Sequence, residues 1–301
     1  FLKTDRGKTK SNAIQIPSLS LPKGGGAIKG IDEKFAVNAV NGTASFSIPL
    51  PFSPARGASP ARAPCPRTST RSGSSARATT ATRSTGSSTA AGNGIFGLGW
   101  NLGHASIKRK TENELPQYQD ALDSDTFVFS EAEDLVPEFA KNADGSLKVD
   151  ANGDYVIREK DSTDDAFTIR FYKPRIEGSF ARIEKWRHKT SDEIKWRVIT
   201  RENVTTLLGW TPAARISDPK APGRIFTWLP EFVFDDKGNC ARYLYKKEDN
   251  AGFDPARPHN KNRFANNDIT YTNTYLSKVF YGNKTPYKNF GDPFPAAADF
   301  M

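Results

Sequence analysis

Two carboxylates at Glu131 and Glu133 have a spacing that could do chemistry. They form an E-x-E pair, which arginine-modifying ADP-ribosyltransferases use, and on a strand both side chains would face the same side. That reaction also needs a Ser-Thr-Ser strand and an upstream arginine at the proper spacing. The nearest match, Thr68-Ser69-Thr70, lies in a stretch that we expect to lack regular structure. We therefore interpret the acidic pair as a strand end or a turn.

A second acidic cluster resembles a calcium-binding loop. Asp150, Asn152 and Asp154 match the first three ligand positions of such a loop. The loop requires glycine at its sixth position and a bidentate glutamate at its twelfth, where this sequence has Tyr155 and Asp161. We therefore predict a hairpin turn here and no calcium site.

Histidine and cysteine are scarce. His104, His188 and His259 lie far apart and form no H-x-x-x-H pair, and Cys65 and Cys240 are the only cysteines. This composition argues against a histidine metal enzyme, a cysteine zinc cluster and a disulfide scaffold. No G-x-S-x-G motif occurs either, so no Ser-His-Asp triad can be proposed. We predict no catalytic, cofactor-binding or metal-binding residue in this chain.

Two weaker motifs also have ordinary interpretations. Asn41, Asn203 and Asn283 begin glycosylation sequons, but three matches are near chance in a chain rich in Asn and Thr. The glycine-rich run Gly94–Trp100 would cradle phosphate only if it opened a helix, and no amphipathic helix follows it. We interpret this run as a structural turn.

The composition is that of a globular protein. The 301 residues are 37% hydrophobic and 26% charged, and no run approaches the length that spans a bilayer. The net charge is +9, but five arginines come from one acid-free stretch: Arg62, Arg67, Arg71, Arg77 and Arg83. We therefore favour a solvated basic surface over a nucleic-acid partner and expect no direct membrane insertion.

The chain termini indicate a fragment. The sequence begins at Phe1 and its only methionine is Met301, so we expect a piece of a longer protein. Residues 1–18 contain no apolar core of a secretory signal, so the sequence alone assigns no location.

Hydrophobic periodicity predicts an all-β fold. Residues 35–51 alternate around Asn41-Gly42 as a hairpin, and alternation with frequent turns continues from Thr126 onward. The clearest hairpin runs from Phe232 through a turn at 235–239 to Tyr245. Short strands and twenty prolines favour antiparallel sandwich-like or barrel-like sheets.

Residues 58–90 break this pattern. They contain only Ala, Ser, Thr, Arg, Pro, Gly and Cys65, so they cannot bury enough apolar surface to offset the entropy of ordering them. We predict an exposed, disordered segment whose flanks lie close together in the fold. Trypsin should cut it first, at Arg67, Arg71, Arg77 or Arg83. The predicted organisation is an extended arm over 1–17 and one β domain over 18–301, interrupted by 58–90.

Several long phrases resemble the SpvB amino-terminal domain family, which opens the Salmonella virulence protein SpvB and the B subunits of insecticidal Tc toxin complexes. The phrases are Ser20–Ile31, Asn41-Gly42-Thr43, Pro49-Leu50-Pro51, Gly92–Trp100, Leu115–Tyr118, Ala132–Pro137 and Asn283–Tyr287. The family commonly has glycine where this chain has Glu131, which weakens the E-x-E hypothesis further.

The resemblance implies a non-catalytic structural and assembly module of a secreted bacterial toxin. In a Tc complex the B subunit joins a C-type RHS subunit in a shell that encloses the toxic cargo, and downstream regions dock on the A-type pore subunit. The alternative is the amino-terminal module of an SpvB-like effector, whose ADP-ribosyltransferase domain would lie outside this fragment and act in the host-cell cytoplasm. No cofactor is implied for the module. An enzyme, or a binding module for carbohydrate or nucleic acid, is the competing hypothesis.

Residues 58–90 depart from the family, which has a shorter segment with alternating apolar residues at this place. Two explanations stay open. One is a genuine insertion, and the other, which we favour, is a pair of compensating frame errors in a GC-rich gene.

Overall fold

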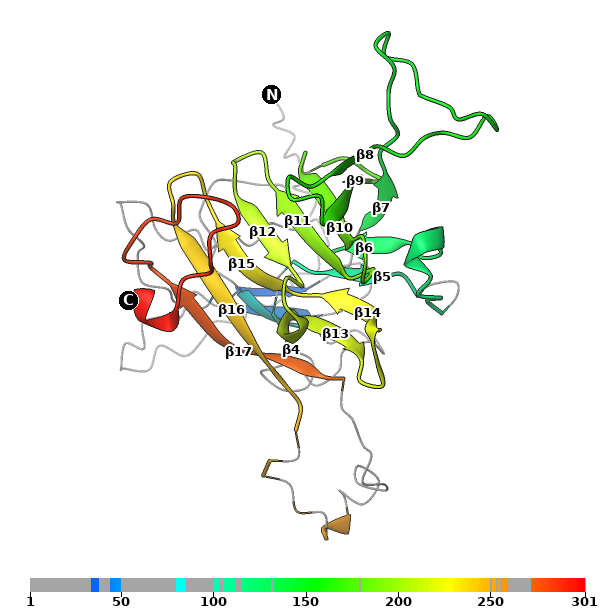
Figure 1. Cartoon of the computed structure of the whole chain (residues 1–301). Coiled ribbons are helices and arrows are strands. Elements are labelled where there is room, and N and C mark those ends of the chain that lie inside the picture. Colours follow the sequence, from blue (N-terminus) through cyan, green and yellow to red (C-terminus); the bar gives the residue numbers. More distant parts are fainter. Residues whose placement is uncertain are drawn as a thin grey trace, which may run out of the picture. The chain divides into compact units, whose positions relative to one another are not determined.

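The computed structural model describes the second of two compact units, Asp32–Met301, in part. The residues described are 34–37, 44–49, 80–84, 100–102, 105–111, 115–130, 133–178, 180–249, 251–252, 254, 256–258 and 272–300. The arm predicted over 1–17 lies outside them. The described residues form strands β1 to β17 and short 3₁₀ helices, which confirms the all-β prediction (Figure 1). Within the described ranges, no helix has the length and apolar character needed to cross a membrane.

The amino-terminal strands form a four-stranded antiparallel sheet in the order β1-β2-β3-β4. Their bounds are β1 Lys34–Val37, β2 Ala44–Pro49, β3 Thr80–Ser84 and β4 Trp100–Leu102. Val37 pairs with Ala44 and Lys34 with Ser47, which is the hairpin predicted over 35–51. The Asn41-Gly42 turn of that hairpin lies outside the described residues.

Strand β3 corrects part of the prediction for residues 58–90. Thr80–Ser84 were expected to lack regular structure, yet they pair with β2 on one side and β4 on the other. Ladder hydrogen bonds join backbone groups, so a strand between two partners does not require large apolar side chains. The other residues of 58–90 are outside the described ranges, and their predicted disorder stays a prediction.

The remaining strands form one large antiparallel sheet in the order β13-β14-β5-β6-β7-β9-β10-β11-β12-β15-β16-β17, with β8 paired to β9 (Figure 1). Their bounds are β5 Ile107–Arg109, β6 Phe127–Phe129, β7 Glu133–Pro137, β8 Glu159–Asp161, β9 Phe167–Pro174, β10 Arg182–His188, β11 Ile194–Ile199, β12 Thr205–Leu208, β13 Arg215–Asp218, β14 Ala221–Trp228, β15 Pro230–Phe234, β16 Cys240–Lys247 and β17 Thr274–Tyr281. The 3₁₀ helices are η1 Asp120–Leu122, η2 Pro212–Ala214 and η4 Ala297–Asp299.

Part of this sheet closes on itself as a barrel. Strand β14 runs directly through Leu229 into β15, so one continuous stretch pairs with β5 at Thr227 and Trp228 and with β12 from Pro230 to Phe234. The N–H of Gly209 donates to the carbonyl of Leu229, and the N–H of Leu229 donates to that of Ala214, each at 2.9 Å. The ring therefore runs from β14 through β5, β6, β7, β9, β10, β11 and β12 back to β15. The barrel form of the predicted fold is the one observed.

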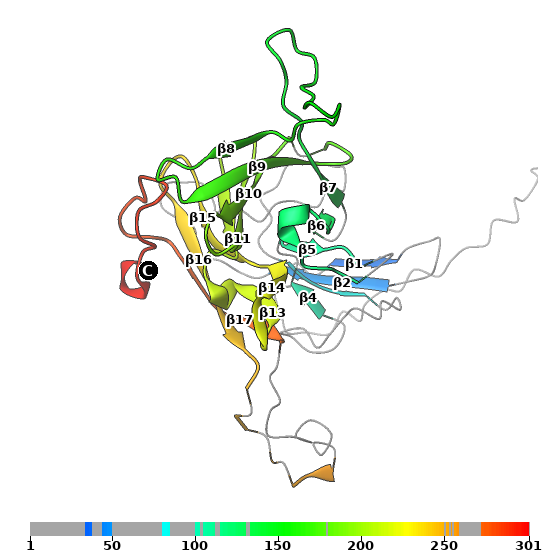
Figure 2. The ribbon, with the colours of Figure 1, turned by 45° about the vertical axis from the view of Figure 1, so that its right-hand side comes forward.

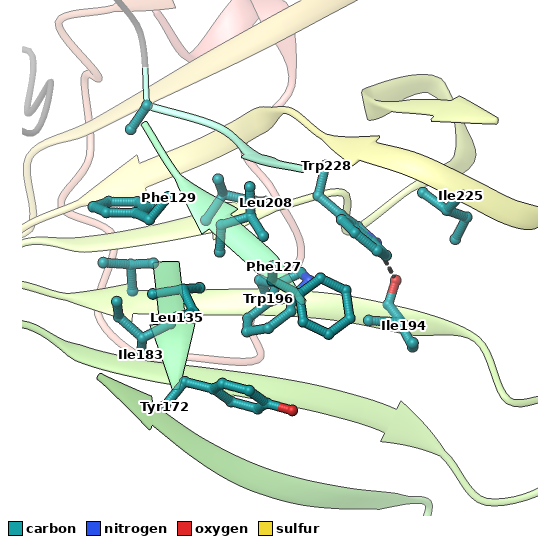
Figure 3. Packing of buried hydrophobic residues seen from close by; sticks show 13 residues of the cluster. Phe127, Phe129, Leu135, Tyr172, Ile183, Ile194, Trp196, Leu208, Ile225 and Trp228 are labelled. Atoms are coloured by element: carbon teal, nitrogen blue, oxygen red, sulfur yellow. Dashed lines mark hydrogen bonds between the residues drawn. The ribbon is translucent and has the colours of Figure 1, made fainter. Parts of the chain in front are cut away.

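The barrel interior is an aromatic core (Figure 3). Phe127 lies at its centre, with ring centroids 5.0 Å from Trp196 and 5.7 Å from Trp228 in edge-on contacts. The indole N–H of Trp228 donates to the carbonyl of Ile194 at 2.8 Å. Inward residues alternate with outward ones along each strand, so the period-2 pattern in the sequence becomes one buried face.

The segment after β17 packs on the outer face of β15 and β16. Tyr287 and Phe300 are buried there with Phe232, whose ring stacks on Phe294 at 4.6 Å. Burial raises the pKa of the Cys240 thiol, which lies in the same cluster, to about 12. The outer face of this part of the sheet is therefore covered by the chain itself.

A long connection between β7 and β8 projects from the sheet (Figures 1 and 2). Three of its segments are joined in a ring of hydrogen bonds, in which Ala140 N–H donates to Val156, Val156 N–H to Lys148 and Lys148 N–H to Ala140. Turns at Asp144-Gly145 and Asn152-Gly153 form its two tips, and both glycines have positive φ.

Candidate functional site at the barrel mouth

Charged side chains enter one end of the barrel, which we call the barrel mouth. Arg109 follows the inward Ile107 on β5, and Lys185 follows the inward Ile183 on β10, each by two residues. Successive side chains alternate across a strand, so both cations point to the interior. The side chain of Arg109 has no exposed surface and that of Lys185 is 2% exposed. Buried charges of this kind must be paired to be tolerated.

The partners of Arg109 come from residues 115–126, which we call the mouth loop. The Arg109 guanidinium donates two bonds to the carboxylate of Asp120, at 2.8 and 2.7 Å, and one to Asp125 at 2.5 Å. Its Nε–H donates to the carbonyl of Ile225 at 2.7 Å. One arginine therefore ties the loop to strands β5 and β14 at the same time.

The carboxylate of Asp125 also organises the loop around itself. It accepts hydrogen bonds from the N–H groups of Gln117 and Tyr118 at 2.8 and 2.9 Å. Burial works to raise the pKa of Asp125, but these bonds and the Arg109 cation outweigh it and lower the pKa below the ordinary value. Tyr118, with φ of 58°, places its ring under the Arg109 guanidinium at 4.8 Å. Asp125 is thus held ionised.

Asp123 joins the mouth loop to the opposite wall. Its carboxylate pairs with the guanidinium of Arg170 on β9 and lies 3.4 Å from the ammonium of Lys185. The Lys185 ammonium also lies 4.8 Å from the centre of the Phe127 ring. Burial lowers the pKa of Lys185, and the charges of Asp120 and Asp123 oppose that shift.

The arrangement holds a loop in place and is poorly suited to acid-base chemistry. Arginine keeps its proton at neutral pH, and Asp125 is tied to three donors, from Arg109, Gln117 and Tyr118. The Cys240 thiol lies elsewhere and its raised pKa keeps it protonated. Among the described residues, no group of histidine, cysteine and acidic side chains is arranged to hold a metal ion.

The structure separates the residues that the sequence singled out. Glu133 begins β7, whereas Glu131 and Thr68-Ser69-Thr70 lie outside the described residues. The carboxylate of Asp150 accepts the N–H groups of Asn152 and Asp154 at 2.8 and 2.9 Å, so this motif is the predicted turn.

The sequons and histidines are also scattered. Asn203 lies exposed in a turn with φ of 57°, and Asn283 is buried, donating its amide to the carbonyls of Gly238 and Thr285. His188 ends β10, while Asn41, His104, His259 and Cys65 are outside the described residues.

Sequence patterns gave no signal for the barrel mouth. Arg109 lies only 11 and 16 positions from its partners Asp120 and Asp125, but Asp123 is 47 positions from Arg170 and 62 from Lys185. The carbonyl of Ile225 that Arg109 also contacts is 116 positions away. Only the topology brings them together.

Residues 38–301 match the family model described as Salmonella virulence plasmid 65kDa B protein. The chain belongs to the SpvB family. Two relatives are named mono(ADP-ribosyl)transferase SpvB. The one from Salmonella choleraesuis (strain SC-B67) is 34% identical over 281 residues, which cover 93% of this chain and 40% of the relative. The one from Salmonella typhimurium (strain 14028s / SGSC 2262) is 33% identical over 267 residues, covering 88% and 38%. This SpvB-family chain therefore spans about two fifths of these relatives.

Solved structures similar to this SpvB-family chain come from two kinds of toxin. The N-terminal domain of effector protein SpvB from Salmonella typhimurium strain LT2 has a TM-score of 0.54 and 32% identity, over 72% of this chain and 62% of that one. The Photorhabdus luminescens Tc holotoxin pore has a TM-score of 0.68 and 29% identity, over 97% and 12%. A crystal structure of TcdB2-TccC3 has a TM-score of 0.64 and 29% identity, over 95% and 12%. One of the matched structures is thus an amino-terminal domain of SpvB.

Proposed function

We propose that this chain is a non-catalytic structural and assembly module of a secreted bacterial toxin of the Tc type. The observation that carries the proposal is the match of nearly the whole chain to 12% of the much longer TcdB2-TccC3 and Tc holotoxin chains. A module that forms a small part of a large assembly contributes surface and rigidity. The closed barrel with a loop tied across its mouth supplies that rigidity.

The absence of catalysis by this module is part of the proposal. The relatives are named as transferases, but the chain matches an amino-terminal domain and spans 40% or less of their length. Buried charges in the barrel mouth are consumed by ion pairs, which favours a structural role for them. Trp196 and Trp228 of the core are fully buried, so these two tryptophans are unavailable to a ligand at the surface.

The proposed partners are the other parts of the toxin complex. These are a C-type RHS subunit, with which the module contributes to the shell around the cargo, and an A-type pore subunit that downstream regions would contact. The proposed location is the extracellular region, with the host-cell cytoplasm as the destination of an effector. No nucleic acid takes part.

Assembly is tested by complementation in trans. The purified chain is mixed with a Tc B subunit that lacks its own SpvB domain and with a C-type subunit, and complexes are measured by size-exclusion chromatography with light scattering. We expect the chain to co-elute with the shell. Gly209→Ala, which weakens the barrel, should lower the yield of complex, and Gly223→Ala should not, because an added Cβ there meets nothing within 4 Å. Failure of the folded chain to co-elute would contradict the proposal.

Activity is tested separately with NAD and actin. We expect neither NAD consumption nor labelling of actin by the purified chain, and Glu133→Gln should change nothing. NAD consumption above buffer that disappears in this variant would show that the chain is a transferase.

The alternative is an SpvB-like effector whose transferase lies beyond this fragment. The similarity to the SpvB N-terminal domain supports it. The sequence of the gene downstream distinguishes the two, because propeller and RHS repeats indicate a Tc B subunit, and a transferase domain after a short linker indicates an effector.

A further inference from the structure

The connection between β7 and β8, residues 138–158, carries an eight-residue repeat, and we call it the projection (Figures 1 and 2). Three short segments follow one another, separated by the turns at Gly145 and Gly153. The first and third positions of the segments are Phe139 and Lys141, Leu147 and Val149, and Tyr155 and Ile157. Antiparallel bridges join Phe139 to Ile157, Lys141 to Leu147 and Val149 to Tyr155. Residues opposite each other, and residues two positions apart, share a face, so these six side chains lie on one face of the projection.

This face of the projection is apolar and exposed. Five of its six side chains are apolar, and Lys141 is the exception. Phe139 and Leu147 are 39% and 41% exposed, and Val149 and Tyr155 are 51% and 57% exposed. The rings of Phe139 and Tyr155 lie 5.4 Å apart, so the exposed side chains are contiguous. Contiguous exposed apolar side chains are typical of sites that contact a protein or a membrane.

The backbone of the projection is already hydrogen-bonded and its base is anchored. The N–H groups of Ala140, Val156 and Lys148 donate to one another's carbonyls in a closed ring. At the base, Arg158 pairs with Glu138 at 2.7 Å, and its guanidinium lies 4.2 Å from the centre of the Phe171 ring on β9. A partner therefore meets a preformed set of side chains, which lowers the entropic cost of binding. It would engage these side chains and would not add a strand to the ring.

The two turns of the projection are acidic. Asp144 lies in one turn and Asp150 and Asp154 lie in the other, and all three are exposed. The basic residues Lys141 and Lys148 belong to the segments between the turns. Surfaces that bind each other carry complementary charge, so the complementary surface has apolar side chains at its centre and lysine or arginine opposite the two turns.

We propose that the apolar face of the projection docks in an apolar groove of another subunit of the toxin complex, between lysine or arginine side chains at its rim. This inference rests on the proposed function and names the surface through which the module assembles. An anionic membrane would repel the carboxylates of both turns. A second copy of the chain would need about 800 Å² from each partner for a stable dimer, far more than four half-exposed side chains supply. A projection of this size suits an assembly in which other contacts complete the interface.

Binding of the chain to the toxin complex tests this docking. The immobilised chain is titrated with a C-type subunit joined to a Tc B subunit that lacks its own SpvB domain, and Kd is measured by biolayer interferometry. Leu147→Ser removes a half-exposed apolar side chain, and we expect Kd to rise about five-fold. Leu122→Ser is the matched control, because Leu122 is 76% exposed in the mouth loop and lies outside the projection.

A charge reversal tests the basic rim of the groove. Asp154→Lys should raise Kd about ten-fold at low salt and less at high salt, since salt screens exposed charges. Asp236→Lys makes the same change in the exposed turn between β15 and β16 and should leave Kd unchanged.

The outcomes separate the docking from the proposed function. Melting temperatures show whether each variant is folded, and a rise in Kd confined to the two projection variants supports the docking. If the parent chain binds and folded Leu147→Ser and Asp154→Lys bind equally well, the docking is wrong and the proposed function stands. A folded parent chain that does not bind contradicts the proposed function and the docking with it. Light scattering of the chain alone and flotation with phosphatidylcholine–phosphatidylserine vesicles test the other occupants. A dimer, or vesicle binding, that Leu147→Ser abolishes would overturn the assignment to another subunit.

Discussion

The barrel and the four-stranded sheet are both antiparallel, but they differ in the types of residue that lie opposite each other on paired strands. In the barrel, Ile183 lies opposite Val198, and both are buried in the core. In the small sheet, one row runs Phe46, Arg83, Trp100 and the next runs Ile48, Ala81, Leu102. In this register the middle strand β3 sets an arginine and an alanine opposite aromatic and aliphatic residues of β2 and β4.

This difference distinguishes two requirements for forming a sheet: hydrogen bonds between backbones, and side chains that fix the register. Ladder hydrogen bonds form between any strands without proline, whereas a buried face fixes the register through its apolar pattern. Ala81 and Arg83 of β3 lie inside residues 58–90. The residues paired with them on β2 and β4 lie outside that segment. The two explanations for residues 58–90, a genuine insertion and compensating frame errors, both stay open.

The largest effect in the barrel is expected from Arg109→Gln. The change leaves the buried carboxylates of Asp120 and Asp125 without their cation, which costs about 3–5 kcal/mol of the free energy of unfolding. Urea denaturation measures it. Arg201→Gln is the control, because Arg201 is 70% exposed and pairs only with its neighbour Glu202, so its loss should stay within about 0.5 kcal/mol. Equal losses in both variants would show that the mouth loop is not held by Arg109.

A smaller loss is expected from Gly209→Ala at the barrel closure. Gly209 has φ of 61°, and a Cβ there would lie 2.3 Å from Cδ1 of Trp228. The clash with a buried ring costs roughly 1–3 kcal/mol, measured by urea denaturation. Gly223→Ala on β14 has open space and should be nearly neutral. A neutral Gly209→Ala would mean that Trp228 does not pack at the closure as described.

Local elements of the barrel were predictable and its closure was not. The hairpin from Phe232 through 235–239 to Tyr245 follows from alternation and a turn, and both are local properties. Closure depends on β5 pairing with β14, more than a hundred residues later, and on the chain turning at Leu229. No short-range sequence pattern encodes such a pairing. The sequence therefore predicted a barrel and a sandwich equally well, and only the strand topology distinguishes them. For the same reason the contact of Arg109 with Ile225 had no sequence signal.

Acid should weaken the barrel through Asp125. Its pKa in the folded chain is lowered below 3.8, so its ionised form contributes stability above that value, and the contribution is lost as pH falls toward the folded pKa. Urea denaturation between about pH 5 and pH 2 should therefore show a falling free energy of unfolding. Asp125→Asn should be less stable at pH 5 and show a shallower fall. An unchanged slope in this variant would assign the acid sensitivity to other carboxylates.

The smallest effect, with the opposite sign, is expected in the four-stranded sheet. Arg83→Val places a β-branched apolar residue between Phe46 and Trp100, and a favourable cross-strand pair contributes roughly 0.2–1 kcal/mol. We therefore expect this change to stabilise β3, seen as stronger protection of its amide groups in hydrogen exchange. Most substitutions lower the stability of a protein or leave it unchanged. Stronger amide protection in Arg83→Val would therefore support the hypothesis that Arg83 is not the native residue of this strand.

Thr82→Val is the matched control for that gain. Thr82 lies in the alternate row, between Ser47 and Asn101, which is polar on both sides. Since the period along a strand is two residues, the same valine one position away enters the other face and should bring no added protection. Equal protection in both variants would contradict the hypothesis of frame errors. Protection that rises only with Arg83→Val would support the hypothesis of frame errors, because a strand read in frame is expected to carry alternating apolar residues.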